Sequence, residues 1–324
     1  MNQPDKSVSL TVDEQGHGCR IDQWIVNNQP QFSRNYWADQ IKSGNVLLND
    51  QTCLPKSKLK IDDSVFIKES CFTPKIQLDN IPQSIQLDII YEDDQILVIN
   101  KPAGLVIHPG AGNSEFTLLN GLLAYYKESA NLPRAGIVHR LDKNTTGIMV
   151  IAKTLESYNS LVQQLQQRII KREYKALVYG HIISGGCIET FYGRHPKNRL
   201  KMAVLVSGKE AITHYTVDKQ FQHFTLLNVQ LETGRTHQIR VHMAHIGHPI
   251  IGDTLYGYRL KLPPKHSDLV KNHLQAFKRQ ALHAFRLTLE HPSSKQTLTW
   301  MAPIPDDLKS LICAIEANYN DNYT

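Results

Sequence analysis

The sequence predicts an α+β fold in which a mixed, largely antiparallel sheet forms the larger of two domains. Runs rich in β-branched and aromatic residues outnumber runs with helical spacing, and the connections between them are short. A length of 324 residues suggests roughly two domains. A hydrophobic content of 41% with 20% charged residues is typical of a globular protein that buries a sizeable core.

A small domain is expected over residues 17–70, after a polar, flexible tail at 1–16. RIDQWIVNN has three apolar side chains at helical spacing, and Ser33 can cap a second helix, NYWADQIKSG, which should end at Gly44. VLLND and SVFI are predicted strands. The segment between them carries lysines that alternate along one face: Lys56, Lys58 and Lys60. Two prolines in CFTPKIQLDNIPQS predict a linker over 71–84.

The sheet domain is expected over residues 85–315, followed by a short tail at 316–324. It opens with two strand-like runs that flank the polar turn Glu92–Gln95, a pattern typical of a hairpin. Further strands are predicted at IMVIAK, YKALVYG, HYTVDKQ, FTLLNVQLE, ALHAFRLTLE and TLTWMA. Helical spacing occurs in TLLNGLLAYY, TLESYNSLVQQLQQR and RVHMAHIG.

The positive charge of the chain is unevenly distributed. The formal net charge is +6, and the span from Leu165 to Glu210 holds nine basic residues against three acidic ones. The nine are Arg168, Lys171, Arg172, Lys175, Arg194, Lys197, Arg199, Lys201 and Lys209. Clustered positive charge favours a polyanion such as nucleic acid, and a solvated charged face explains it equally well.

Cysteine usage and the first residues predict a cytoplasmic protein. The five cysteines are scattered without a C-x-x-C pair, which fits a reducing compartment. The start, MNQPDKSVSL, has neither the basic nor the apolar region of a signal peptide. No apolar run approaches the roughly 18 residues of a membrane span.

The stretch GIVHRLDKNTTGIMVIAK, residues 136–153, places an arginine and an aspartate just before a buried-looking strand. It is reminiscent of the HRD loop of protein kinases, but Leu141 separates Arg140 from Asp142. The sequence also has no DFG, no kinase glycine loop and no P-loop motif, which argues against nucleotide hydrolysis or transfer. An ordinary polar turn and a nucleophile for another substrate both remain open on this stretch alone.

Two further stretches carry candidate functional residues. LETGRTHQIRVHMAHIGHPIIGD contains four histidines, but their spacing is not that of a zinc motif, so hydrogen bonding is the expected fate of the rings. In the same stretch Arg235 and Arg240 are of interest, because a buried arginine requires a carboxylate or phosphate partner. Tyr174 lies within the strand-like REYKALVYG and, taken alone, is a core or edge tyrosine.

Together these three stretches closely resemble the signature motifs of the RluA-type pseudouridine synthases. NKPAGLVIHPG and HPSSKQTLTWMAPIP resemble the same family, and the small N-terminal domain resembles an S4 RNA-binding domain. The resemblance covers nearly all of residues 17–310 in the order of the family. The S4-like part departs from the usual pattern, with Asp62-Asp63 in place of Gly-Asp and Asn49-Asp50 in place of Asn-Gly, which bears on its RNA contacts.

The resemblance implies a pseudouridine synthase fold and the isomerisation of uridine in RNA. This reaction breaks the C1′–N1 bond, turns the uracil and rejoins it through C5, with no cofactor and no metal. By resemblance Asp142 is the carboxylate at the ribose, as nucleophile or as base. Arg240 is its ion-pair partner, and Tyr174 stacks on the uracil and helps to remove the C5 proton.

The resemblance also assigns RNA contacts. Arg140 contacts the RNA backbone or fills the gap left by a flipped uridine. The other expected RNA-binding residues are His139, Arg172, Arg235, Lys56, Lys58 and Lys60. His139, Thr145 and Thr146 are expected mainly to fix the loop by hydrogen bonds.

The stretches PRAGIVHRLDK, HMAHIGHPIIGD and KRQALHA resemble one branch of the family, which acts on 23S ribosomal RNA. This implies a target in the helix 69 hairpin, met by a monomer within the precursor of the large subunit. The alternatives are a non-catalytic RNA-binding assembly factor, a paralogue that modifies other 23S or transfer RNA uridines, and a metal-dependent hydrolase that uses the histidines.

Overall fold

The computed structural model describes residues 7–29, 32, 34–72, 81–110, 112–257 and 267–321. The chain forms two compact units. One consists of Met1–Ile81 with Lys127–Ala135, and the other of Pro82–Tyr126 with Gly136–Thr324. The predicted helix cap Ser33 and residues 73–80 of the predicted linker lie outside the described residues.

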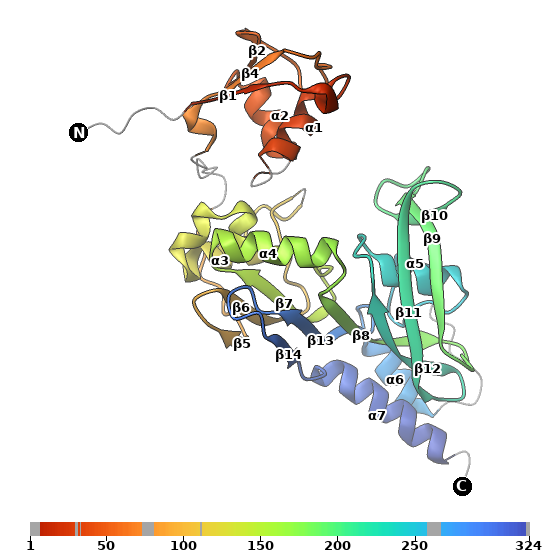
Figure 1. The fold of residues 1–324 in the computed structure, drawn as a ribbon. Helices are drawn as coiled ribbons and strands as arrows, with labels where there is room; N and C mark the ends of the chain where they lie inside the picture. Colours follow the sequence, from red (N-terminus) through yellow and green to blue (C-terminus); the bar gives the residue numbers. More distant parts are fainter. Residues whose placement is uncertain are drawn as a thin grey trace. The chain divides into compact units, whose positions relative to one another are not determined.

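The first unit is built on a small antiparallel sheet with the strand order β1-β4-β2-β3 (Figure 1). Its strands are β1 (Val8–Thr11), β2 (Val46–Leu48), β3 (Gln51–Thr52) and β4 (Ser64–Ile67). The two predicted helices are present as α1 (Ile21–Asn28) and α2 (Arg34–Lys42). The buried side chains of Ile21, Trp24 and Ile25 form part of the core, as their spacing predicts.

The prediction of a flexible tail over residues 1–16 is wrong for its second half. Residues 8–11 form β1, which pairs with β4 from Val8 opposite Ile67 to Thr11 opposite Ser64. Val12 is buried, and Gly16 lies so close to Trp24 that a Cβ there would meet the indole at 2.4 Å. The strand is only four residues long, so its alternation of apolar and polar residues is too short to stand out in the sequence.

The second unit contains a ten-stranded sheet, which confirms the predicted fold class. The strand order is β10-β9-β11-β12-β8-β13-β7-β6-β5, with β14 paired to β13. The strands are β5 (Ile89–Glu92), β6 (Ile96–Lys101), β7 (Thr146–Ala152), β8 (Lys171–Tyr179), β9 (Gly186–Arg194), β10 (Met202–Leu205), β11 (Lys209–Gln220), β12 (Phe224–Leu231), β13 (Leu282–Glu290) and β14 (Thr297–Met301). The β13–β7 pair is parallel and the other described pairs are antiparallel.

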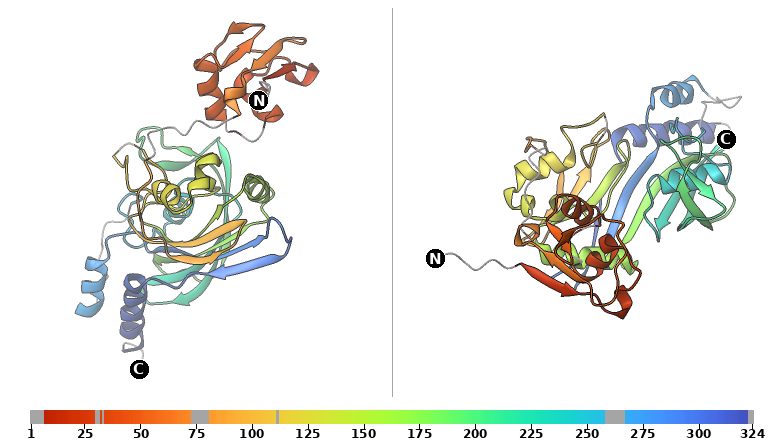
Figure 2. Two further views of the ribbon diagram at one scale, coloured as in Figure 1. Left: turned by 90° about the vertical axis from the view of Figure 1, so that its left-hand side faces the viewer. Right: turned by 90° about the horizontal axis from the view of Figure 1, so that it is seen from above.

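Five α-helices accompany this sheet: α3 (Leu118–Tyr125), α4 (Leu155–Gln166), α5 (Gln238–His245), α6 (Asp268–Ala276) and α7 (Asp306–Asp321). Helix α4 packs on β7, and α5 packs on β10 and β11. Helices α6 and α7 lie side by side (Figures 1 and 2). Among the described residues, no helix is both long and apolar enough to cross a membrane.

The predicted C-terminal tail at 316–324 is also wrong in part, because α7 continues to Asp321. Its buried residues Leu308, Leu311 and Ile315 recur at helical spacing, and the last turns extend this packed face. Strands β9 and β10 were not predicted. Glycines and charged residues interrupt β9, and its burial alternates only partly, so the strand pattern is weak in the sequence.

A close contact between β7 and β13 positions the loop that precedes β7. Gly147 has φ 116°, and a Cβ there would lie 2.1 Å from the carbonyl oxygen of Ala284. Only glycine permits the two backbones to approach so closely. Residues 146–152 are all buried, and β7 lies between β13 and β6 in the sheet. The loop that leads into β7 is therefore held in place at the start of this strand.

Candidate active site

Asp142 lies in the loop before β7, and three polar side chains fix this loop. The backbone oxygen of Asp142 accepts a hydrogen bond from the Thr145 amide at 3.0 Å. The Thr145 hydroxyl accepts one from the Gln280 amide at 3.0 Å, and Thr146 is 2.9 Å from His283 Nδ1. His139 Nε2 accepts the Val150 amide at 3.1 Å. The predicted structural role of His139 and the threonines is therefore present.

A fully buried lysine lies behind the same loop. Lys101 Nζ donates to the carbonyl oxygens of Pro102, Leu105 and Lys143 at 2.7, 3.0 and 3.0 Å. Burial lowers the pKa of Lys101 to about 7, and the nearby Asp142 opposes this shift. The ammonium thus ties the NKPAG segment to the residue that follows Asp142. Sequence reasoning did not single out Lys101, although a lysine directly after the apolar strand ILVIN is unusual.

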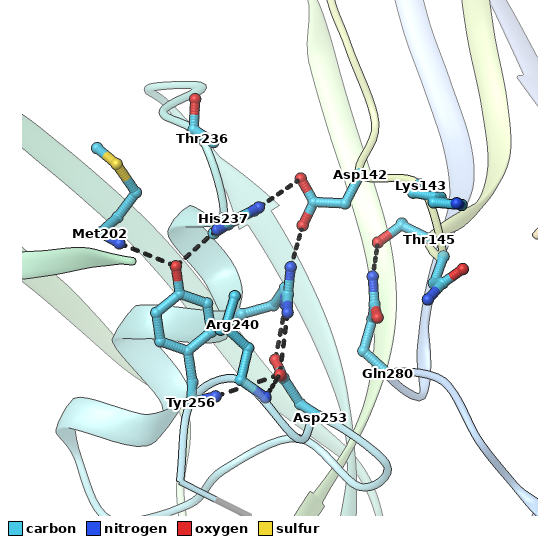
Figure 3. A network of polar contacts seen from close by, with 12 residues as sticks. Asp142, Lys143, Thr145, Met202, Thr236, His237, Arg240, Asp253, Tyr256 and Gln280 are labelled. Carbon is cyan, nitrogen blue, oxygen red and sulfur yellow. Dashed lines mark hydrogen bonds and ion pairs between the residues drawn. The ribbon is translucent and has the colours of Figure 1, made fainter. Parts of the chain in front are cut away.

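Arg240 joins Asp142 to a second carboxylate (Figure 3). Its Nη1 donates to Asp142 Oδ2 at 2.9 Å, which is the predicted ion pair. Its Nε and Nη2 donate to the two oxygens of Asp253 at 2.6 and 2.9 Å. The guanidinium is buried, which disfavours its charge, but the two carboxylates outweigh burial and raise the pKa of Arg240. Two carboxylates share one guanidinium, so the cluster has a net negative charge.

Asp253 is a site residue that sequence reasoning missed. It is buried, and its Oδ1 also accepts the backbone amides of Leu255 and Tyr256 at 3.0 and 3.3 Å. These contacts orient Asp253, and Asp253 in turn orients Arg240. The acid at the end of HPIIGD was the available indication, since a buried arginine in the same stretch requires a carboxylate partner.

His237 faces the other oxygen of Asp142, and Tyr256 lies beside both His237 and Arg240 (Figure 3). His237 Nε2 is 3.8 Å from Asp142 Oδ1, and His237 Nδ1 is 2.6 Å from the Tyr256 hydroxyl. The same hydroxyl oxygen accepts the backbone amide of Met202 at 3.0 Å. Arg240 lies over the Tyr256 ring at 5.0 Å. His237 and Arg240, which both face Asp142, therefore both contact Tyr256.

Tyr174 is buried in β8, near the loop of Asp142. It lies opposite Ala284 of β13, and Ala284 lies opposite Gly147 of β7, so neighbouring strands carry the tyrosine and the loop of Asp142. Burial raises the pKa of Tyr174, Arg172 lowers it, and Asp142 raises it further. The phenol is therefore protonated at neutral pH.

The predicted RNA-binding residues of this unit differ in their surroundings. Arg140 is exposed next to Asp142. Arg235 is exposed as well, and its Nε donates to the Glu210 carbonyl at 3.2 Å. Arg172 packs against Gly234, where a Cβ would lie 2.5 Å from its Nη1. A larger residue at Gly234 would displace the end of this flexible side chain.

Two buried side-chain nitrogens lack a hydrogen-bond partner within the described part of the chain, His139 Nδ1 and Arg172 Nε. Burial and the positive charge of Arg172 lower the pKa of His139 to about 3, so its ring is neutral. Since Nε2 accepts the Val150 amide, the proton is on Nδ1. Both unpaired nitrogens are donors, and both are shielded from solvent.

The basic span between residues 165 and 210 divides into two parts. Arg168 is paired with Glu210 and Glu232, and Lys175 is paired with Asp218. Exposed cations remain at Arg194, the last residue of β9, and in the loop between β9 and β10 at Lys197 and Arg199. In the first unit the lysines predicted to share one face are exposed, and Leu59 between them is buried.

The histidines of the 231–253 stretch make hydrogen bonds, as expected. His242 contacts the hydroxyls of Thr190 and Thr213 at 3.0 and 2.8 Å, and His248 Nδ1 is 2.8 Å from the Tyr179 carbonyl oxygen. The described residues contain no group of three or more His, Cys, Asp or Glu that could hold a metal ion.

Comparison with known proteins identifies the family. Residues 95–245 match the family model for RNA pseudouridylate synthase. Ribosomal large subunit pseudouridine synthase D of Salmonella typhimurium is 48% identical over 316 residues, which cover 97% of this chain and 96% of the relative. The protein of the same name from Xylella fastidiosa is 47% identical over 309 residues, covering 95% and 92%. The chain belongs to the RNA pseudouridine synthase family.

Solved structures of pseudouridine synthase domains share the fold. Human RNA Pseudouridylate Synthase Domain Containing 1 has a TM-score of 0.54 at 26% identity, covering 71% of this chain and 87% of that one. The human domain-containing 4 protein has a TM-score of 0.55 at 25% identity, covering 71% and 93%. The resemblance to RluA-type pseudouridine synthases is confirmed, as is the finer likeness to the branch called RluD, the large-subunit synthase D.

Proposed function

We propose that this pseudouridine synthase isomerises uridines in the helix 69 hairpin of 23S ribosomal RNA, with Asp142 acting at the ribose of a flipped uridine. The observation that carries the proposal is the chain Asp253–Arg240–Asp142. Asp253 occupies two donors of the guanidinium, and a third donor holds one oxygen of Asp142. This arrangement favours an ionised and oriented carboxylate whose other oxygen can reach a substrate.

The chemistry requires one ionised carboxylate beside C1′ of the ribose. As a nucleophile, Asp142 bonds to C1′ while the C1′–N1 bond breaks, and the turned uracil then displaces it through C5. As a base, it removes a ribose proton to drive the same cleavage and returns that proton later. In either case C5 loses a proton and N1 gains one, so the product is an isomer of the substrate and no cofactor is consumed.

We assign Tyr174 to stacking on the uracil. A flat aromatic ring lets a base rotate and still keeps it in the site. Burial raises the pKa of Tyr174, so the phenol keeps its proton. A protonated phenol is a poor acceptor for the C5 proton. The ionised Asp142 is the better base for that proton. This differs from the expectation that the tyrosine itself helps to remove the proton.

We further infer how the RNA is bound. Arg140, exposed beside Asp142, is suited to the gap left by a flipped base, and the unpaired donors of His139 and Arg172 are suited to acceptor atoms of the flipped nucleotide. The first unit is proposed as an S4 RNA-binding domain whose lysines contact phosphates. The lysines of this unit and the basic residues of the span 165–210 would then make two separate sets of phosphate contacts. Such an arrangement suits a folded hairpin better than a linear strand.

The same proposal places the protein in the cytoplasm, as a monomer acting on the precursor of the large subunit. The scattered, unpaired cysteines support a reducing compartment. A non-catalytic assembly factor of the same fold is the alternative from another class. It would require the RNA-binding residues but not the carboxylate of Asp142.

Mapping pseudouridines in the ribosomal RNA of a strain that lacks the gene tests both function and target. We expect the helix 69 pseudouridines to be absent, restored by the wild-type gene and not restored by Asp142→Asn. Pseudouridines lost elsewhere in ribosomal or transfer RNA would instead identify a different target. Modification restored by Asp142→Asn would refute the role of the carboxylate. Large subunits that assemble normally with Asp142→Asn, but not without the gene, would support an additional assembly role.

A further inference from the structure

We infer that His237 is a positioning residue for Asp142 and that Tyr256 fixes its imidazole in the tautomer with the proton on Nε2. This inference deepens the proposed function and rests on it. It adds a contact to the second oxygen of the carboxylate, the one that Arg240 does not hold, and it assigns a role to a tyrosine that follows the family-model match at 95–245.

The tautomer follows from the donors and acceptors around the Tyr256 hydroxyl. The backbone amide of Met202 can only donate, so the tyrosine oxygen accepts from it at 3.0 Å. The hydroxyl proton is then free for an acceptor, and His237 Nδ1 lies 2.6 Å away. A neutral imidazole that accepts at Nδ1 must carry its proton on Nε2.

The proton on Nε2 faces the carboxylate of Asp142. Nε2 is 3.8 Å from Oδ1, while Arg240 holds Oδ2 at 2.9 Å. A distance of 3.8 Å is too long for a hydrogen bond, so Oδ1 is attracted but not occupied. The carboxylate is thus limited in rotation, and the oxygen that must reach the ribose stays available. The opposite tautomer would present a lone pair to the carboxylate and repel it.

The backbone at His237 supports a dedicated position for this ring. His237 has φ 60° and ψ 17°, a left-handed conformation at the residue before α5. Histidine adopts this conformation more readily than bulky or β-branched residues, at a modest cost in free energy. The conformation turns the ring towards Tyr256, and the two rings meet edge to face at 5.5 Å. The ring is partly buried, with 20% of the side chain exposed.

Tyr256 connects the two groups that face Asp142. Its hydroxyl binds His237, and its ring lies under the guanidinium of Arg240 at 5.0 Å. The backbone amide of Met202, at the start of β10, fixes the hydroxyl. Removing this one hydroxyl should therefore release His237 while the aromatic contact with Arg240 stays.

A set of four variants tests the positioning role. Tyr256→Phe removes the hydroxyl. His237→Asn keeps a residue that tolerates the left-handed backbone and can accept from Tyr256, but its amide is too short to reach Asp142. His237→Gln places an amide N–H near the position of Nε2. His181→Asn, at an exposed histidine that follows β8, makes the same substitution away from the site and is the matched control. The readouts are the single-turnover rate of tritium release from RNA labelled at uridine C5, with RNA at saturation, and the Kd for the same RNA.

We expect Tyr256→Phe and His237→Asn to slow the single-turnover rate by about 10- to 100-fold, the loss of one hydrogen bond near a charged group. The Kd should change less than about twofold, because these residues orient the carboxylate rather than bind RNA. His237→Gln should recover several-fold over His237→Asn, and His181→Asn should match the wild type. Equal rates in His237→Asn and the wild type, or a higher Kd with an unchanged rate, would overturn the inference.

A spectroscopic measurement tests the tautomer without activity. In protein labelled with ¹⁵N-histidine, the His237 resonances are assigned as those lost in His237→Gln. At pH 8 we expect an unprotonated Nδ1 and a protonated Nε2, and a mixture of tautomers in Tyr256→Phe. A proton on Nδ1 in the wild type would refute the inference, whatever the enzyme does. Absence of tritium release by the wild type would refute the proposed function instead, and the tautomer would still be decided.

Discussion

The two oxygens of the Asp142 carboxylate have different surroundings, and this difference defines the site at the scale of single residues. Arg240 fixes one oxygen, and the other faces His237 at a longer distance. The guanidinium can do this because Asp253 binds its remaining donors. The planar, forked group matches both carboxylates at once, and an ammonium would not.

Arg240→Lys is therefore expected to lower the single-turnover rate by about 100-fold or more, although the charge is kept. Lysine would make one contact where arginine makes three, and Asp253 would be left with an unpaired buried charge. Asp253→Asn should lower the rate in the same direction, with a smaller effect. Arg286→Lys, at an arginine of β13 that is paired with Glu173, is the control and should retain most of the rate. Near wild-type chemistry in Arg240→Lys would contradict the assigned geometry.

His242 gives a prediction for the pH dependence of stability. Burial lowers its pKa from 6.5 to about 4. The unfolded chain then binds more protons than the folded one between these values, so stability is lost as pH falls from about 6.5 to 4. Each pH unit in this window is worth about 1.4 kcal/mol for this group. His242→Asn should flatten the acid side of a plot of Tm against pH, and His181→Asn, at an exposed position after β8, should not.

At the scale of elements, the contact of β7 with β13 determines where the catalytic loop lies. Gly147→Ala would drive a Cβ into the Ala284 carbonyl at 2.1 Å, and the positive φ adds strain. We expect Tm to fall by several degrees or more and activity to fall strongly, since the strand must shift. Gly110→Ala is the matched control, because a Cβ there meets nothing within 4 Å. A fully active and stable Gly147→Ala protein would show that the loop does not depend on this contact.

The elements that could be predicted are the long and strongly periodic ones. The buried run of β7, the amphipathic α4 and the hairpin of β5 and β6 all follow from local sequence. Strands β1 and β10 could not be predicted because each has only four residues, and β9 could not because glycines and charged residues interrupt its pattern. Their pairing is fixed by neighbours distant in the sequence rather than by local pattern.

The site could be predicted only through the family motifs. Asp142 and Arg240 are 98 residues apart, and no spacing rule joins them. The roles of Lys101, Asp253 and Tyr256 depend on contacts that exist only in the folded chain. His237 was visible as one of four histidines, but its partner could not be deduced from the sequence.

At the scale of the whole molecule, the chain is one catalytic unit joined to a small unit with exposed lysines. If Lys56, Lys58 and Lys60 contact phosphates, replacing all three by glutamine should weaken RNA binding and reduce the salt dependence by about one counterion per lysine. The single-turnover rate at saturating RNA should stay unchanged. Glutamine at Lys295 and Lys309, which are exposed in the other unit, is the control. An unchanged salt slope in the triple variant would exclude these phosphate contacts.

The central claim is that Asp142, held by Arg240, performs the isomerisation. The most direct test is the release of tritium from RNA labelled at uridine C5, with purified protein in excess over a helix 69 hairpin. We predict one equivalent of tritium released per modified uridine by the wild type, and none above background by Asp142→Asn with its RNA affinity retained. Undiminished release by Asp142→Asn, or no release by the wild type from this hairpin and from whole 23S RNA, would contradict the account.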